Sequence, residues 1–219
     1  MPSSPVLLRV MQSSLSILLI NWVFQGMRGM QSKELTFRLV LEFFIGLFFF
    51  YLLFDYPVDL WAKLFLSLLS AHTVNWLFNT HLWVCVRYFR IYRRNPEALS
   101  AFIKIVKKQI NGIYWIDEAV CIGSVGDKGD VMTWRADIDL RLFFKPGVLN
   151  YFKLNFYLIF LRVYALVAVI PLDLYAYNDI RYLDNFKKDE GISLIKDTNA
   201  NVSRMYSRKV NKTMTDMGE

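Results

Sequence analysis

Residues 121–144, CIGSVGDKGDVMTWRADIDLRLFF, carry the pattern that decides the fold of this chain. Gly123 and Ser124 end one apolar run, and Asp137 and Asp139 stand one residue apart inside the next. Side chains alternate along a strand, so both carboxylates point to one side, about 7 Å apart, while their neighbours face the core. Two like charges on one strand face repel each other unless a cation lies between them.

Magnesium fits such a pair, because it prefers oxygen ligands and binds between carboxylates and substrate phosphates; manganese is the substitute. The turn at Gly123 and Ser124 offers backbone N–H groups and a hydroxyl, which suit a phosphate. A third acid on the next strand would complete a two-metal site. Asp173, in PLDLYAY (171–177), lies where that strand should run, and Asp179 is the alternative if the register differs.

Helix and strand patterns surround this stretch. A helix is expected from Pro96, which suits the first helical position, to Gly112, which ends the apolar periodicity. The apolar run 148–170 lies between two strand patterns and stops at Pro171, so it predicts a crossover helix packed on a sheet. A weak strand over 192–196 follows. The fold class predicted is α/β (α+β) with a small mixed sheet.

The first ninety residues form a second part. A chain that is 55% hydrophobic but 21% charged is expected to have one part for lipid and one for water. Three apolar segments, 6–24, 35–54 and 60–86, are each near the ~20 residues that a membrane helix needs. About three spans over 1–90 are therefore predicted, although the first and third segments can instead lie partly in the interface. The water-soluble domain is assigned to 95–197, and the polar end, 198–219, to a disordered basic tail.

Charges in the connections orient these segments. Arg28 and Lys33 lie between the first and second, Asp55 and Asp59 between the second and third, and four arginines follow within 87–94. Basic flanks belong on the cytoplasmic side. We therefore expect a multi-pass membrane protein with its N-terminus outside and its second domain in the cytoplasm.

Several polar residues interrupt the apolar segments. Arg38 and Glu42 are spaced to pair on one helix. His72 and His81 are expected to face a polar seam between helices, although ionisable residues inside a membrane are also functional candidates.

The overall composition narrows the function. A net charge of +7 fits an anionic membrane surface or a phosphate-rich substrate. Cys85 and Cys121 lie in apolar surroundings without metal-site spacing, so both are expected to be buried, unreactive thiols. Two histidines are too few for a His-rich metal site.

Gly123-Ser124, Asp137-Ile138-Asp139 and Asp173, in that order, resemble the signature of the nucleotidyltransferase superfamily of DNA polymerase beta type. The resemblance covers roughly residues 96–197. It implies a nucleotidyltransferase-like fold and attack by a hydroxyl or phosphate on the α-phosphorus of a nucleoside triphosphate, with release of pyrophosphate.

The same resemblance implies roles for the residues. Asp137 and Asp139 would hold the metal ions, Asp173 would bind metal and help to activate the nucleophile, and Gly123 and Ser124 would hold the outgoing phosphates. Lys128 and Arg141 are further candidates for contacting the triphosphate.

The membrane part indicates the substrate class. A cytoplasmic catalytic domain tied to membrane helices is expected to transfer a nucleotidyl or phospho-alcohol unit to a lipid-linked or glycan precursor. The first alternative is a minimal nucleotidyltransferase of antitoxin type that adenylylates a protein. The second is a non-catalytic nucleotide-binding membrane protein. Independently of these, Asp137 and Asp139 can also be read as a solvated strand face whose charges pair with Arg135 and Arg141. A nucleic-acid partner is not expected, because the chain has no room for domains that grip a template.

Overall fold

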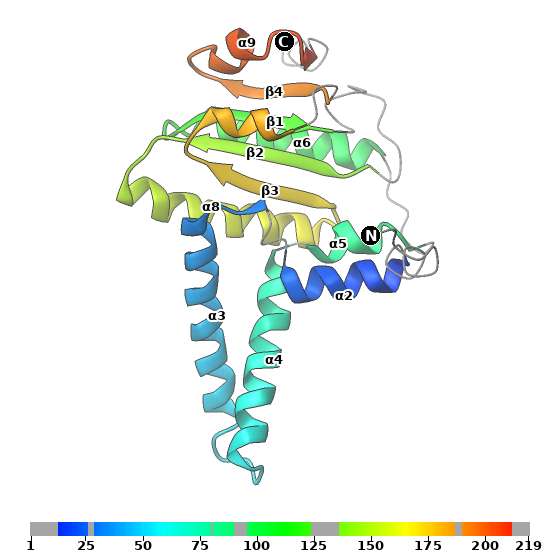
Figure 1. Ribbon diagram of the computed structural model, residues 1–219, viewed down its shortest axis with the longest axis vertical. Coiled ribbons are helices and arrows are strands. Elements are labelled where there is room, and N and C mark those ends of the chain that lie inside the picture. The colour runs from blue at the N-terminus through cyan, green and yellow to red at the C-terminus, as the bar shows by residue number, and fades with distance from the viewer. Residues whose placement is uncertain are drawn as a thin grey trace, which may run out of the picture.

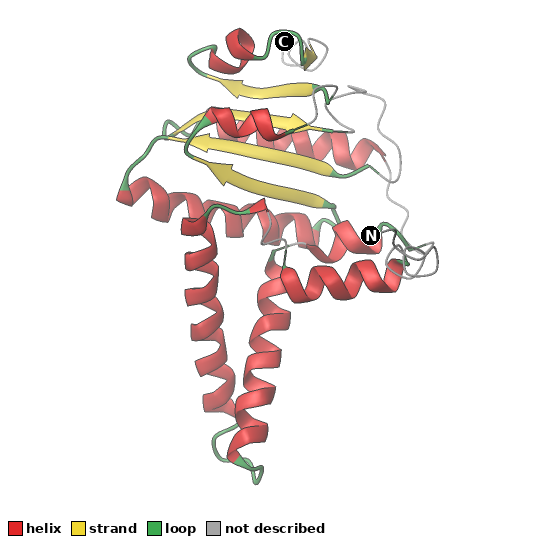
Figure 2. Cartoon of the chain, viewed as in Figure 1, coloured by secondary structure: helices red, strands yellow, loops and turns green. Residues whose placement is uncertain are grey.

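The computed structural model describes residues 13–25, 29–79, 81–89, 96–123, 136–186 and 190–211. The elements, in chain order, are α2 (Ser14–Phe24), α3 (Ser32–Leu52), α4 (Leu60–Phe78), α5 (His81–Val86), α6 (Pro96–Asn111), β1 (Ile116–Ile122), β2 (Ile138–Phe144), α8 (Val148–Val167), β3 (Leu172–Tyr177), the 3-10 helix η2 (Ile180–Asn185), β4 (Ile192–Asp197), α9 (Asn201–Met205) and β5 (Val210–Asn211). Figure 1 labels most of them and Figure 2 separates helices from strands.

The strands form one mixed sheet in the order β3-β2-β1-β4-β5. β1 is antiparallel to both β2 and β4, whereas β2 is parallel to β3. Parallel neighbours need a long crossover connection, and α8 supplies it. The expected mixed α/β domain with a crossover helix is therefore confirmed, as are the expected limits of α6 at Pro96 and just before Gly112.

The main core lies between one face of the sheet and the helices α6 and α8. Leu154, Leu158 and Leu161 from α8 pack there with Ile138 and Leu140 from β2. These two strand residues alternate with Asp137, Asp139 and Arg141, so the charged side chains belong to the opposite face, as the alternation predicts.

The opposite face of the sheet has its own smaller apolar cluster, to which the end of the chain contributes. Val202 is fully buried and Tyr206 is nearly so. The carboxylate of Asp197, at the end of β4, accepts hydrogen bonds from backbone N–H groups in the first turn of α9, those of Val202 at 3.2 Å and Ser203 at 2.9 Å. The predicted disordered tail is thus wrong for 198–211, because a carboxylate cap and two buried side chains order this polar segment. The rest of the predicted tail lies outside the described residues.

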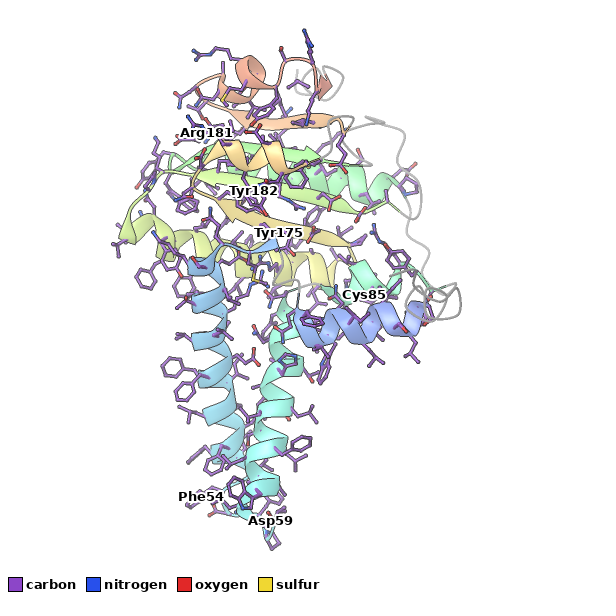
Figure 3. All side chains as sticks on the ribbon, in the orientation of Figure 1. Phe54, Asp59, Cys85, Tyr175, Arg181 and Tyr182 are labelled. Atoms are coloured by element: carbon purple, nitrogen blue, oxygen red, sulfur yellow. The ribbon has the colours of Figure 1, made fainter. Side chains whose placement is uncertain are left out.

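Helices α3 and α4 form a hairpin that projects from the β3 edge of the domain (Figure 1). Among the residues that the structure describes, α3 is the one helix long and apolar enough to cross a membrane. Phe54 and Asp59 lie at the far end of the hairpin, well away from Tyr175 and Arg181 in the domain (Figure 3). The expected single segment over 60–86 is broken, since α4 ends at Phe78 and α5 begins at His81.

The expected span over 6–24 is also corrected. Helix α2 begins at Ser14, because Ser13 is extended and its side chain caps the helix. Its 11 residues make a helix of about 16 Å, too short for a hydrocarbon core of about 30 Å. In Figure 1, α2 lies crosswise to the hairpin, on the domain side of it. The structure therefore has a hairpin and a crosswise helix in place of three parallel spans.

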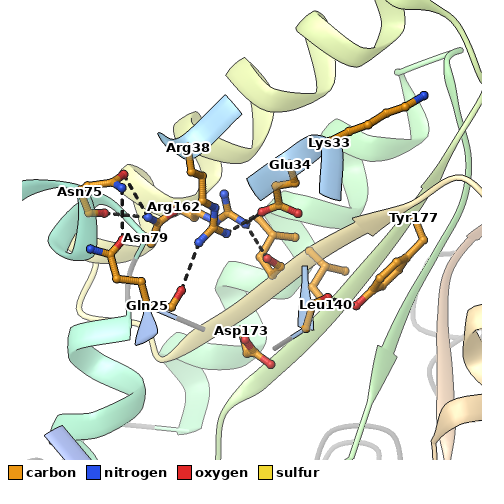
Figure 4. A network of polar contacts seen from close by, with 12 residues as sticks. Gln25, Lys33, Glu34, Arg38, Asn75, Asn79, Leu140, Arg162, Asp173 and Tyr177 are labelled. Atoms are coloured by element: carbon orange, nitrogen blue, oxygen red, sulfur yellow. Dashed lines mark hydrogen bonds and ion pairs between the residues drawn. The ribbon is translucent and has the colours of Figure 1, made fainter. Parts of the chain in front are cut away.

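A buried ionic cluster fastens the hairpin to the domain (Figure 4). Arg162 of α8 donates hydrogen bonds to Oε1 of Glu34 in α3 and to the carbonyl oxygen of Leu174 in β3, both at 2.6 Å. Arg38 pairs with the same Glu34 oxygen at 2.5 Å. The expected Arg38–Glu42 pair is wrong, because Arg38 is turned toward Glu34 and the domain. The first turn of α3 is thereby tied to the strand that carries Asp173.

Glu42 faces α4 instead, in a polar seam between the helices. Its Oε1 lies 2.9 Å from Nδ1 of His72, and its Oε2 accepts from Asn75 at 2.8 Å. Nε2 of His72 lies 2.9 Å from the carbonyl oxygen of Trp22, so this nitrogen donates. The expectation that His72 faces a polar seam is confirmed; the side chain of His81 lies outside the described residues.

Candidate functional site

Three of the predicted site residues meet where β2 and β3 begin. Asp139 and Asp173 are register partners on these parallel strands, and Asp137 immediately precedes β2. The three carboxylates are only partly exposed, at 16%, 23% and 21% for Asp137, Asp139 and Asp173. The structure therefore brings together the three acids that the sequence singled out, on the sheet face opposite α6 and α8.

Gly123 completes this group from the end of β1. Ile122 is the register partner of Asp139, so the next residue lies beside the carboxylate. Gly123 has φ +73°, and a Cβ there would lie 2.9 Å from Oδ2 of Asp139. Both the conformation and the close approach require glycine. Ser124 and Lys128, the other residues predicted to hold phosphates, lie outside the described residues.

Arg141 lies on the same strand face, two residues after Asp139. It donates hydrogen bonds to Oδ2 of Asp173 at 2.9 Å and to the carbonyl oxygen of Asp173 at 2.7 Å. Its Nη2 is also 3.8 Å from Oδ1 of Asp139. The guanidinium lies over the rings of Tyr175 and Phe186. Arg141 therefore acts here as counter-ion to two acids; its expected contact with the triphosphate stays a prediction.

Arg87 is the residue of this site that sequence reasoning missed. It follows α5 directly, and its Nη1 lies 2.5 Å from Oδ1 of Asp137. In the sequence, Arg87 belongs to a basic run whose pattern predicts only a membrane orientation. No local pattern links it to an acid 50 positions away; only the packing of α5 against β3 brings them together.

The charges of the site are unevenly compensated. Burial and the neighbouring Asp137 and Asp173 together raise the pKa of Asp139 to about 8, against a smaller lowering by Arg141. Burial alone would lower the pKa of Arg141, but Asp173 and Asp139 outweigh it and the pKa is raised. The site therefore holds three carboxylates and two arginines. The carboxyl of Asp139 is the one that keeps its proton up to neutral pH.

The structure also separates the two candidates for the third acid. Asp179 follows β3 and caps η2, accepting a hydrogen bond from the backbone N–H of Arg181 at 2.8 Å. Asp179 therefore lies outside β3, the strand that pairs with β2, whereas Asp173 lies within β3 opposite Asp139. The expected register, and with it the choice of Asp173, agrees with the strand pairing.

Cysteine chemistry does not contribute to this site. Cys121, in β1, is 1% exposed, and burial raises the pKa of its thiol to about 12. Cys85 is equally buried. The expectation of two buried thiols is confirmed.

The acids suit a divalent cation by their chemistry, because carboxylate oxygens are the ligands that Mg²⁺ prefers and a cation would relieve the repulsion among the three neighbouring acids. Within the described ranges, however, no three His, Cys, Asp or Glu side chains are already arranged around one ion position. Two of the three acids are instead paired with arginines, Asp137 with Arg87 and Asp173 with Arg141. A metal ion would have to compete with these two arginines.

Comparison with known proteins gives no match, whether to a family model, to a curated protein or to a solved structure.

Proposed function

We propose that this chain is a membrane-anchored, metal-dependent nucleotidyltransferase that acts on a lipid-linked or glycan precursor at the cytoplasmic face. The observation that carries the proposal is the in-register pairing of Asp139 with Asp173, beside Asp137 and against the backbone of Gly123. This arrangement supports the proposal, because the nucleotidyltransferase-like signature expects a glycine turn, two acids one residue apart and a third acid on the neighbouring strand.

The chain's own residues would divide the chemistry among them. Asp137 and Asp139 would hold Mg²⁺ or Mn²⁺, with Asp173 as a third ligand, and the metal would supply positive charge for the phosphates. Asp173 would also orient the acceptor oxygen and, where the acceptor is a hydroxyl, take its proton. The new bond joins that oxygen to the α-phosphorus, the bond from this phosphorus to the β-phosphate oxygen breaks, and pyrophosphate leaves. Arg87 and Arg141, released from the acids, would face the leaving phosphates.

The position of the site supports an acceptor delivered by the membrane. β3 is the strand nearest the hairpin (Figure 1), and it carries Asp173. Arg87, at the end of the helix that continues the hairpin, contacts Asp137. Membrane-proximal residues therefore form one border of the acid cluster, which suits an acceptor whose other end is held in lipid.

The experiment uses the full chain in lipid vesicles that contain a total membrane-lipid extract. Each nucleoside triphosphate, labelled at the α-phosphate, is supplied with Mg²⁺, and both pyrophosphate release and label in the lipid and glycan fractions are measured. We expect transfer with one nucleotide, its loss in Asp139→Asn, and little change in the matched control Asp179→Asn. Equal transfer by Asp139→Asn and the unchanged chain would refute the proposed site, and label in protein would favour the adenylylating alternative.

One observation favours a second candidate, a non-catalytic membrane protein. Arg87 and Arg141 neutralise the acids in the manner of structural ion pairs. In that case Mg²⁺ should not raise the unfolding temperature. The proposed enzyme should instead gain about 2.7 kcal/mol at a metal concentration 100 times the dissociation constant, and Asp139→Asn should lose that gain.

A further inference from the structure

We propose that α8, besides joining β2 to β3, rests its outer face in the membrane interface and so seats the domain itself on the bilayer. This inference depends on the membrane anchoring contained in the proposed function, but not on any catalytic step.

The outer face of α8 is apolar where a helix covering a sheet should be polar. Leu149, Phe152, Phe156 and Phe160 are 65%, 48%, 64% and 53% exposed. They recur every three or four residues, so they form one stripe along the helix. The other side of α8 carries the buried leucines of the main core. The stripe is therefore an addition to what the fold of the domain needs.

This stripe is continuous with the hairpin. The rings of Phe37 in α3 and Phe156 in α8 lie edge to face with centroids 6.0 Å apart. The hydroxyl of Tyr151 donates to the carbonyl oxygen of Lys33, in the first turn of α3. In Figure 1, α8 lies crosswise at the domain end of the hairpin. A bilayer that surrounds α3 would consequently meet the phenylalanines of α8 at its surface.

A second crosswise helix indicates that the partner is a lipid surface. Leu15, Leu19 and Val23 of α2 are also exposed, and α2 lies crosswise on the domain side of the hairpin (Figure 1). One bilayer plane can contact α2 and α8 together, whereas a protein partner would have to reach around the hairpin. The exposed Lys33 and the net charge of +7 suit anionic headgroups.

Contact of α8 with the membrane interface would set the distance between the acid cluster and the membrane surface. With α8 and α2 in the interface, the edge strand β3 is held next to the headgroups, and Asp173 with it. The reactive group of an acceptor would then have to lie at headgroup level, which limits the substrate class to lipids with a short polar part between membrane and acceptor oxygen.

The test measures depth with single cysteines in the full chain. Cys85 and Cys121 are replaced by Ala, and one cysteine carrying an environment-sensitive fluorophore is placed at Phe156, Leu47 or Ser207. Leu47 lies in α3 and Ser207 is exposed after α9. In vesicles with anionic phospholipid, lipids that carry a quencher near the headgroup or near the acyl-chain end are compared.

We expect the headgroup-level quencher to act most strongly at 156, the deep quencher at 47, and neither at 207. If 47 is quenched and 156 behaves like 207, the inference about α8 is overturned while the anchor stands. If 47 also escapes quenching, the anchor itself fails, and the inference fails with it. If 156 escapes quenching and the unlabelled Phe156→Cys chain forms disulfides between copies, a second chain covers this face, which also overturns the inference.

Discussion

Gly123 and Asp139 are in such close contact that a Cβ atom at position 123 would lie 2.9 Å from Oδ2 of Asp139. The turn after β1 and the central acid of β2 therefore determine each other's position. Any side chain at 123 must push the carboxylate away or move the turn.

Gly123→Ala is expected to destabilise the domain and to weaken metal-dependent stabilisation. The left-handed backbone alone costs about 1–2 kcal/mol with a side chain, and the displaced Asp139 adds to it. The control is Gly112→Ala, where the new Cβ would lie 3.5 Å from its nearest neighbour, the Gln109 carbonyl oxygen. Thermal unfolding with and without Mg²⁺ measures both effects. Equal behaviour of the two variants would contradict the close contact.

The raised pKa of Asp139 predicts a pH dependence. Its pKa is about 8 in the folded chain against an ordinary 3.8, so between these values the folded state holds a proton that the unfolded state has lost. Stability should therefore fall as pH rises from about 4 to about 8. Asp139→Asn, which stays neutral, should flatten this fall and raise the unfolding temperature at pH 8 without divalent cations. Asp179→Asn should keep the original slope; parallel curves for all three chains would rule the shift out.

Arg87 should compete with a metal ion for Asp137. Arg87→Gln removes the ion pair at 2.5 Å, so the metal-free chain should unfold at a lower temperature. The more negative site should then bind Mg²⁺ or Mn²⁺ at a roughly threefold to tenfold lower concentration, equal to about 0.7–1.4 kcal/mol. Arg204→Gln changes the net charge equally but removes only contacts to backbone carbonyls. A weaker metal response in Arg87→Gln would contradict this competition between Arg87 and the metal ion.

Glu34 should be far more important for stability than an exposed carboxylate. Glu34→Gln leaves Arg38 and Arg162 buried without their shared carboxylate, a change that costs about 3–5 kcal/mol in comparable buried pairs. The exposed Asp55, in the connection between α3 and α4, supplies the control, because Asp55→Asn should stay within about 0.5 kcal/mol. Unfolding in detergent compares them. A small effect at Glu34 would mean that the hairpin and the domain do not depend on this cluster.

The hairpin predicts a labelling pattern in intact cells. Tyr56 lies in the connection between α3 and α4 and is 61% exposed, and Ser32 begins α3. With both native thiols buried, Tyr56→Cys should react with a membrane-impermeant thiol reagent and Ser32→Cys should not. The reverse pattern would invert the orientation, and labelling of both would argue against membrane insertion of the hairpin.

The sequence by itself determined the elements whose signals are local. Pro96 and Gly112 bound α6 because one suits a helix start and the other its end. Alternation along 138–144 fixed which side chains of β2 face the core, so Asp137 and Asp139 were assigned correctly to one face. The run over 148–170 was recognisable as a crossover helix from the strands on either side, which also placed Asp173 beside Asp139.

Tertiary structure alone decided which distant groups meet. Arg38 has an acid about one helical turn away on each side, Glu34 and Glu42. It pairs with Glu34 because Arg162 of α8 binds the same carboxylate. Arg87 reached Asp137 because α5 packs against β3, and Val202 became buried because Asp197 caps α9 above the sheet. Periodicity reports which face of a helix or strand is buried, but a charge finds its partner through the three-dimensional arrangement of the elements, which no local pattern of residues contains.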